Sequence, residues 1–293
     1  MAVGGVGLVA GFVGSMLGIG GGVFLVPLFS VVLGLPLKPA IATSLVCVIA
    51  TAAAGANVYL RQGLADIRLA MLLEIPTVVG AIAGGMLASV LEADALALIF
   101  VALALYTAWT MFRRHGRSQG DARGGPGPEE TELAATGDPG EGGVSAGGGS
   151  WREREYFDAK AGRVVRYRIE RLGPGLAVSV VGGLASGLLG IGGGIIKVPV
   201  MNLAMKVPMR VAVATSNFMV GITAAASAVV YYANGLVDPL VASAAALAVL
   251  VGGNLGARTA ARVDQGMLAR VFAVVLAVLA LQMLYRVLGS AGG

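Results

Sequence analysis

The sequence predicts an all-α integral membrane protein made of two inverted repeats. Hydrophobic residues are 57% of the 293 residues and charged residues only 13%, about half the charged fraction of an average soluble protein. A glycine-rich motif occurs twice, and each copy interrupts an apolar stretch near its middle. We therefore expect each repeat to be a broken or re-entrant helical hairpin with glycines at its tip, followed by three transmembrane helices.

The duplicated motif lies in residues 11–27 and 183–199. The two copies are GFVGSMLGIGGGVFLVP and GLASGLLGIGGGIIKVP, with nine identical positions and no gap. The same offset of 172 residues relates further pairs: Pro36 and Pro208, Asp66 and Asp238, Gly80 and Gly252, and Gly84 and Gly256. Duplication of a hydrophobic unit that glycines interrupt indicates a repeat architecture. The chain then divides into a first membrane repeat, 1–112, a polar insert, 113–172, and a second membrane repeat, 173–293.

Hydrophobicity predicts the spanning segments within each repeat. An apolar run of about 20 residues matches the hydrocarbon core of a bilayer. Such runs occur at 39–60, 69–91, 95–112, 211–233, 239–257 and 266–288. The N-terminus has no basic segment before its apolar stretch, so we expect no cleaved signal peptide.

The first segment of each repeat is overlong. Residues 2–34 are apolar for more than thirty positions, too long for one untilted span and too short for two. A hairpin that turns near the membrane midplane explains this length, and so does one long helix with an unwound centre. With hairpins the repeats are inverted and Lys and Arg divide 18 to 2 across the membrane; with full spans the division is 14 to 6. Because basic residues concentrate on the cytoplasmic side, we predict inverted repeats, a cytoplasmic insert and both termini outside.

The insert has two parts with different compositions. Residues 116–150 are rich in Gly with scattered Pro and acidic residues, which predicts disorder. In 151–171, Val165, Tyr167 and Ile169 alternate with charged residues, and this alternation predicts a small β-hairpin. An amphipathic helix at the membrane surface is the alternative.

The glycine tips predict an anion site. Glycines leave backbone N–H groups unshielded, and each tip opens a short helix, at Val23 or Ile195, whose N-terminal dipole attracts anions. Two tips that meet near the midplane would form a pocket for a small anion. Close helix packing is the alternative explanation for the glycines. The candidate tip residues are Gly18, Gly20, Gly21, Gly22, Gly190, Gly192, Gly193 and Gly194.

Polar side chains near the tips extend this hypothesis. Lys197 takes the place of Leu25 in the other copy; it could attract the anion, pair with a carboxylate or snorkel to the interface. Glu74 is the candidate for proton coupling, although its spacing from Arg68 favours an interfacial ion pair. Further groups could donate to an oxyanion or bond within their own helices: Thr43, Ser44, Thr215, Ser216 and Asn217.

The remaining reactive residues do not indicate catalysis. Cys47 is the single cysteine, so it forms no internal disulfide, and we interpret it as core packing. His115 lies among arginines at the membrane edge and is interpreted as solvated. The predicted spans hold no cluster of His, Cys or carboxylates. We therefore expect no enzyme, no metal and no cofactor.

The paired motifs resemble those of the sulfite exporter TauE/SafE family. Each GIGGG element is followed by a proline and then an Ala-Thr-Ser triplet, here Pro27 with 42–44 and Pro199 with 214–216. The resemblance implies a prokaryotic cell-membrane carrier of a small sulfur oxyanion or organosulfonate, such as sulfite, thiosulfate or sulfoacetate, working by alternating access. An uncoupled anion channel and a non-catalytic membrane subunit are the alternatives. The expected partners are the anion and the lipid bilayer, and not nucleic acid.

Overall fold

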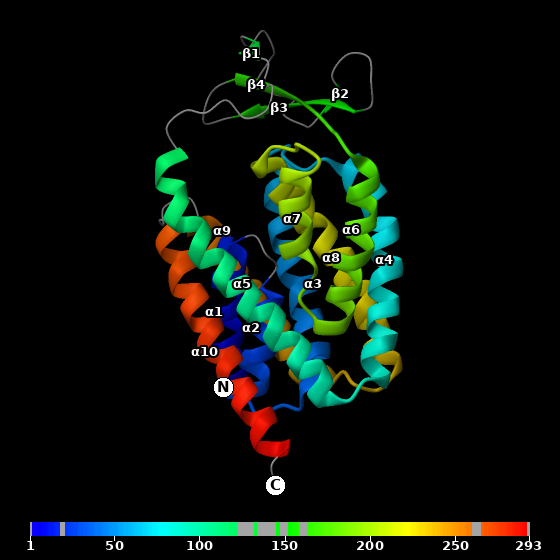
Figure 1. Cartoon of the computed structure of the whole chain (residues 1–293), viewed down its shortest axis with the longest axis vertical. Coiled ribbons are helices and arrows are strands. Elements are labelled where there is room, and N and C mark those ends of the chain that lie inside the picture. Colours follow the sequence, from blue (N-terminus) through cyan, green and yellow to red (C-terminus); the bar gives the residue numbers. More distant parts are fainter. Residues whose placement is uncertain are drawn as a thin grey trace.

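The protein is almost entirely helical and its long helices are apolar, which confirms the all-α membrane class that the sequence predicts. A computed structural model of the chain describes residues 2–17, 21–121, 132–133, 145–146, 152–158, 163–259 and 265–291. Within these ranges the chain forms ten α-helices, one π-helical turn and four short strands (Figure 1). Five of the described helices are long and apolar enough to cross a membrane.

The helices of the two halves follow the same order. The first half contains α1 (Ala2–Leu17), α2 (Gly22–Pro27), the π-helical turn η1 (Leu28–Val32), α3 (Leu37–Arg61), α4 (Ile67–Val90) and α5 (Ala93–Asp121). The second half contains α6 (Leu172–Leu189), α7 (Gly194–Leu203), α8 (Met209–Ala233), α9 (Pro239–Thr259) and α10 (Gln265–Ala291). Each predicted span lies inside one helix, except that 69–91 extends one residue past the end of α4. α5 continues nine residues past the predicted boundary at 112, through a segment that contains no proline to stop it.

Equivalent helices in the two halves have equivalent ends. α3 begins after Pro36 and α8 after Pro208, each with the backbone dihedrals of an extended proline. Both helices are followed by a glycine in the left-handed region, Gly63 with φ 63° and Gly235 with φ 69°. A left-handed glycine is the common residue just past a helix end, because it has no Cβ to clash. The same local signals therefore set the same helix lengths twice.

Glycines bring helices of opposite halves into close contact. α4 packs on α6, and α1 packs on α9. A Cβ at Gly84 would collide with the carbonyl of Leu184, and one at Gly256 would collide with the carbonyl of Phe12. Leu184 and Phe12 are themselves related by the 172-residue offset. These glycines have the packing role that small residues have in membrane helix interfaces.

The insert contributes a small antiparallel sheet. Its strands are β1 (Glu132–Leu133), β2 (Ser145–Ala146), β3 (Glu153–Asp158) and β4 (Arg163–Arg168), in the order β1-β4-β3-β2. Strands β3 and β4 occupy the region where a hairpin was expected. Most of 116–150, the segment predicted to be disordered, lies outside the described residues. The inner face of the sheet packs on the near ends of the helices, with Tyr156 and Tyr167 joining Leu69, Leu73 and Met205 in one apolar cluster.

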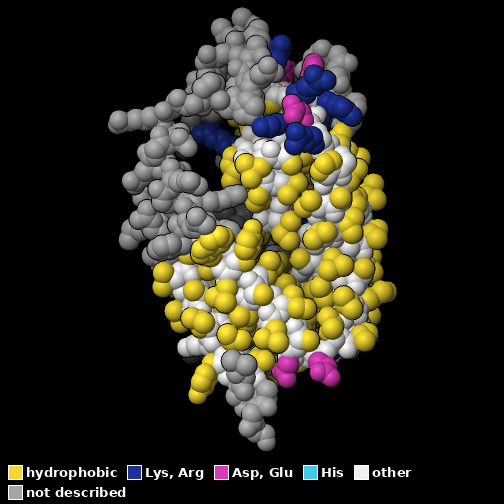
Figure 2. Space-filling view, viewed as in Figure 1, with side chains coloured by type: hydrophobic (Ala, Val, Ile, Leu, Met, Phe, Trp, Pro, Cys, Tyr) yellow, Lys and Arg dark blue, Asp and Glu magenta, His cyan; other side chains and the backbone are white. Residues whose placement is uncertain are grey.

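The surface separates apolar and charged regions (Figure 2). Hydrophobic side chains cover the middle of the visible face, lysines and arginines gather at the sheet end together with some acidic residues, and further acidic residues lie at the opposite end. Two basic residues lie at that opposite end. Lys38 donates to the carbonyl of Ser89 at the end of α4 (2.9 Å), and Arg286 donates to the carbonyl of Ser30 (3.1 Å).

Candidate functional site

The two glycine tips touch each other. A Cβ added at Gly22 would lie 2.5 Å from the carbonyl oxygen of Gly190 and 2.9 Å from the Cα of Ile191. Ser44 on α3 also reaches this contact, since its Oγ lies 3.1 Å from the Gly190 oxygen and 2.8 Å from the carbonyl oxygen of Ile41. The structure thus brings Gly22, Ser44 and Gly190 together. Gly18 and Gly20 lie outside the described residues.

Both short helices begin after a left-handed glycine. Gly21 precedes α2 and Gly193 precedes α7, each with φ 72°. Gly192 is also left-handed, with φ 75°, and packs against Val220 and Val48. A Cβ at Gly193 would lie 2.8 Å from the carbonyl oxygen of Gly182 on α6. A side chain at Gly193 would therefore disturb both the backbone conformation and the packing of the hairpin.

Lys197 lies in the first turn of α7, which folds back along α6. Its stem passes Gly182 on α6, where a Cβ would lie 3.6 Å from Lys197 Cγ, an ordinary van der Waals distance. The Lys197 Cε lies 3.6 Å from the position of a Gly193 Cβ, so the side chain bends toward the glycine tip. Gly194, the first residue of α7, is buried beside it.

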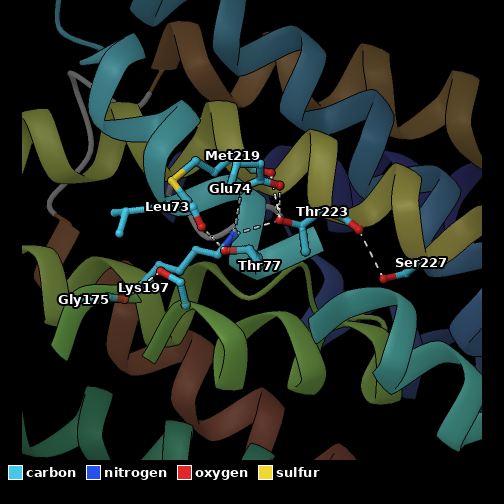
Figure 3. Close-up of polar contacts among 9 residues, drawn as sticks. Leu73, Glu74, Thr77, Gly175, Lys197, Met219, Thr223 and Ser227 are labelled. Atoms are coloured by element: carbon cyan, nitrogen blue, oxygen red, sulfur yellow. Dashed lines mark hydrogen bonds and ion pairs between the residues drawn. The ribbon is translucent and has the colours of Figure 1, made fainter. Parts of the chain in front are cut away.

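Lys197, Glu74 and Thr223 form a buried polar cluster (Figure 3), converging from α7, α4 and α8. The residues are 3%, 5% and 0% exposed. Lys197 Nζ lies 3.4 Å from Glu74 Oε2 and donates to Thr223 Oγ1 at 2.8 Å, and the threonine hydroxyl donates to Glu74 Oε1 at 2.6 Å. The expectation that Glu74 pairs with Arg68 is wrong. Glu74 points into the helix bundle, where it is buried, whereas Arg68, six residues earlier on α4, is exposed.

The other predicted polar residues lie apart from this cluster. Thr215 accepts a hydrogen bond from the backbone N–H of Asp66 (3.0 Å), at the sheet end of α4. Asn217 donates to the carbonyl of Ala52 (3.4 Å) and so links α8 to α3. Thr43 and Ser216 are fully buried in α3 and α8, and the Ser216 hydroxyl has no hydrogen-bond partner among the described residues.

A second buried charge cluster joins the sheet to the helices. Asp66 caps α4 by accepting from the N–H of Leu69 (3.0 Å). Its other oxygen, Oδ2, lies 3.3 Å from Arg154 Nε on β3 and accepts from the Tyr167 hydroxyl on β4 (3.2 Å). Burial and the nearby Asp66 carboxylate raise the pKa of the Tyr167 hydroxyl. Sequence reasoning missed this cluster and Thr223, although Asp66 recurs at Asp238 and Thr223 recurs at Thr51.

The described residues contain no group of three His, Cys, Asp or Glu that could hold a metal ion. Cys47 is buried in the main apolar core, as expected for a packing residue. The side chain of His115 lies outside the described residues. The candidate site is therefore built from backbone, hydroxyls and one ion pair.

Comparison with known proteins identifies the family. The profile of the sulfite exporter TauE/SafE family matches residues 3–283. The chain belongs to this family. A relative, the probable membrane transporter protein YunE of Bacillus subtilis (strain 168), is 27% identical over 287 residues, covering 95% of each chain. A probable membrane transporter protein of Xylella fastidiosa (strain 9a5c) is 32% identical over 112 residues, covering 38% of this chain and 43% of its own. No solved structure matches the chain. The family and its relatives support a membrane transporter rather than an enzyme.

Proposed function

We propose that this TauE/SafE family member is a secondary carrier that holds a small sulfur oxyanion or organosulfonate beside the start of α7, between the glycine tips. The observation that carries the proposal is Lys197, a cationic side chain that is only 3% exposed and bends toward the tip. An intramembrane charge is costly and usually marks a substrate or ion pathway.

Two sources of positive potential coincide at this place. The ammonium of Lys197 lies beside the first turn of α7, a helix of ten residues whose N-terminus carries partial positive charge. Thr223 adds a hydroxyl that can donate. A fully ionised sulfur oxyanion offers several acceptor oxygens and no donor, so it matches a site that presents mainly donors. Family membership supports the same class of substrate.

The arrangement of the two hairpins supports alternating access. The α6–α7 hairpin opens at the sheet end, where the N–H of Glu170 donates to the carbonyl of Met205 (3.1 Å). The return segment of the α1–α2 hairpin reaches the opposite end, where Ser30 accepts from Arg286 (3.1 Å). Tips that enter from opposite ends and meet are what inverted repeats provide. Since the lysines and arginines visible in Figure 2 gather at the sheet end, we infer that the sheet faces the cytoplasm of a prokaryotic cell and both termini face outward.

Transport is tested in liposomes containing the purified protein. Sulfite, thiosulfate, sulfoacetate and taurine are offered with and without imposed pH and voltage gradients, and saturable uptake of at least one is expected. Lys197→Met should weaken anion affinity by about ten- to a hundredfold, equivalent to about 1.4–2.8 kcal/mol. Arg68→Met removes an exposed charge from α4 and serves as the control. If none of these compounds is taken up, the proposal is contradicted. An ohmic single-channel current would indicate a channel instead.

Orientation is tested separately by labelling single cysteines in a Cys47-free protein. A cysteine at Arg166 on β4 should react only from the cytoplasmic side, and one at Glu92 only from outside. A sheet that is labelled from outside contradicts the assigned orientation.

A further inference from the structure

Lys197 and Glu74 neutralise each other in the structure, so an anion that binds Lys197 competes with Glu74. The lysine ammonium has two partners among the described residues, Glu74 Oε2 at 3.4 Å and Thr223 Oγ1 at 2.8 Å. Both side chains of the pair are nearly inaccessible to water, at 2% and 7% side-chain exposure. An incoming anion therefore takes the place of a carboxylate rather than of water.

Among the residues that the structure describes, the displaced carboxylate finds no replacement cation nearby. α6, which packs on α4, has no ionisable side chain between Leu172 and Leu189. The charged residues of α3 lie at its two ends, and those of α4 and α8 other than Glu74 lie in their first turns, at Arg68 and Arg210. A buried carboxylate left without its partner is strongly unfavourable, and such a group neutralises instead. Glu74 must therefore take up a proton when the anion occupies Lys197.

Thr223 can serve both states of Glu74. In the structure its Oγ1 lies 2.6 Å from Glu74 Oε1 and 3.0 Å from the carbonyl oxygen of Met219. While Glu74 is ionised, the hydroxyl donates to the carboxylate. When Glu74 is protonated, the acid can donate to Thr223 Oγ1 and the hydroxyl can turn to the Met219 carbonyl. Proton uptake thus leaves no buried donor without an acceptor.

We propose that the Lys197–Glu74 pair is a proton–anion symport site, with the anion on Lys197 and the proton on Glu74. The inference rests on the proposed anion transport and adds its coupling ion. The charges balance: the empty site holds one ammonium and one carboxylate, and the loaded site holds an ammonium, an anion and a neutral acid. A monovalent anion then crosses without net charge, and the sum of the anion and proton gradients sets the direction. A divalent anion such as thiosulfate crosses with a net charge of −1, so the membrane potential also contributes.

The proposal fixes the sign of the pH effect. The loaded site binds one proton more than the empty site, so anion affinity rises as pH falls. The change is about tenfold per pH unit over the range in which Glu74 is ionised in the empty carrier and protonated in the loaded carrier. Outside that range the carboxyl has the same protonation in the empty and loaded carrier, and the anion affinity no longer changes with pH.

The test uses thiosulfate and sulfoacetate, which stay fully ionised at neutral and mildly acidic pH, so that any proton moved belongs to the protein. Anion uptake into liposomes is recorded together with internal pH, and anion-dependent thermal stabilisation is recorded against pH. Wild type should carry one proton with each anion. Glu74→Gln imitates the protonated acid and should carry none, with an anion affinity that no longer varies with pH.

Glu74→Gln has a second signature. Its Lys197 lacks a counter-ion when the site is empty, so anion should stabilise this variant more than wild type at neutral pH. Arg68→Gln, on the exposed face of the same helix, is the matched control and should keep the wild-type pH profile. If Glu74→Gln fails to fold, the number of protons that wild type carries with each anion tests the symport by itself.

The outcomes separate the two proposals. Anion uptake by wild type without proton movement, at an affinity independent of pH, overturns the symport while leaving the carrier intact. A Glu74→Gln protein that keeps the wild-type pH dependence overturns the assignment of the proton to Glu74. Failure of wild type to move sulfite, thiosulfate, sulfoacetate or taurine overturns the proposed function itself.

Discussion

The two halves of this protein share a scaffold but differ at one buried cluster. The charged cluster uses one residue of the first half and two of the second, and the 172-residue offset gives each a counterpart: Leu25 for Lys197, Ala246 for Glu74 and Thr51 for Thr223. The threonine is retained, whereas both charges are replaced together. Since an unpaired buried charge is costly, the difference teaches that the lysine and the glutamate depend on each other, and that only one of the two related positions has ionic chemistry.

A second pair of positions shows the same kind of difference. Asp66 and Asp238 both accept hydrogen bonds from N–H groups at the start of the following helix. Asp66 is 3% exposed beneath the sheet, whereas Asp238 is exposed. The insert lies at one end of the molecule. It therefore covers only the cap at Asp66, which it pairs with Arg154, and leaves the cap at Asp238 exposed.

The largest expected loss of stability follows from removing one partner of the Lys197–Glu74 ion pair. Glu74→Ala leaves Lys197 buried without a counter-ion and should lower the free energy of unfolding by about 3–5 kcal/mol. Adding Lys197→Leu recreates the residues of the related position, Leu25 and Ala246, and should restore most of the loss. Thermal unfolding in detergent measures both. A double variant no more stable than Glu74→Ala would show that the two charges are independent.

The two aspartates offer the next comparison. Asp66→Asn keeps a capping oxygen but leaves Arg154 buried without a counter-charge, so a loss of about 3 kcal/mol is expected. Asp238→Asn retains an exposed cap and should cost less than about 1 kcal/mol. Unfolding of both variants is followed in the same detergent, and equal losses would contradict the role assigned to the sheet.

Glycines at related positions should behave alike, in contrast to the charges. Gly84→Ala and Gly256→Ala each force a methyl group against a backbone carbonyl of the facing helix, and each should cost about 1–3 kcal/mol. Gly5→Ala is the control, because nothing lies within 4 Å of a Cβ there. Thermal unfolding of the three variants would separate a shared packing role from a role in only one half.

The smallest expected effect concerns the Tyr167 hydroxyl. Tyr167→Phe removes one hydrogen bond to Asp66 and should cost about 1 kcal/mol, whereas Tyr285→Phe alters an exposed ring and should cost nothing measurable. Because burial raises the pKa of the Tyr167 hydroxyl, the folded protein keeps its proton while the unfolded chain ionises near pH ~10. Wild type should therefore lose stability as pH rises above about 10, and the Phe variant should lose less.

Local patterns in the sequence predicted most of the fold. Apolar length located each span, and the glycines marked the breaks before α2 and α7. The site was predicted less well, because a sequence does not give the distance between helices. Glu74 was matched with Arg68, six residues away, although its partner Lys197 is 123 residues away. Thr215 was expected to face an anion, but it lies at Asp66, a contact between halves that no local signal shows.

The cap at Asp66 and the proton site at Glu74 belong to the same stretch of α4. Glu74 follows Asp66 by eight positions, a helical rise of about 12 Å. That stretch is therefore held at one end by the sheet, through the contacts of Asp66 with Arg154 and Tyr167, and at the other by the ion pair with Lys197. We expect a displacement of Glu74 away from Lys197 to act also on the contacts of Asp66 with Arg154 and Tyr167, because one continuous stretch of helix carries both groups.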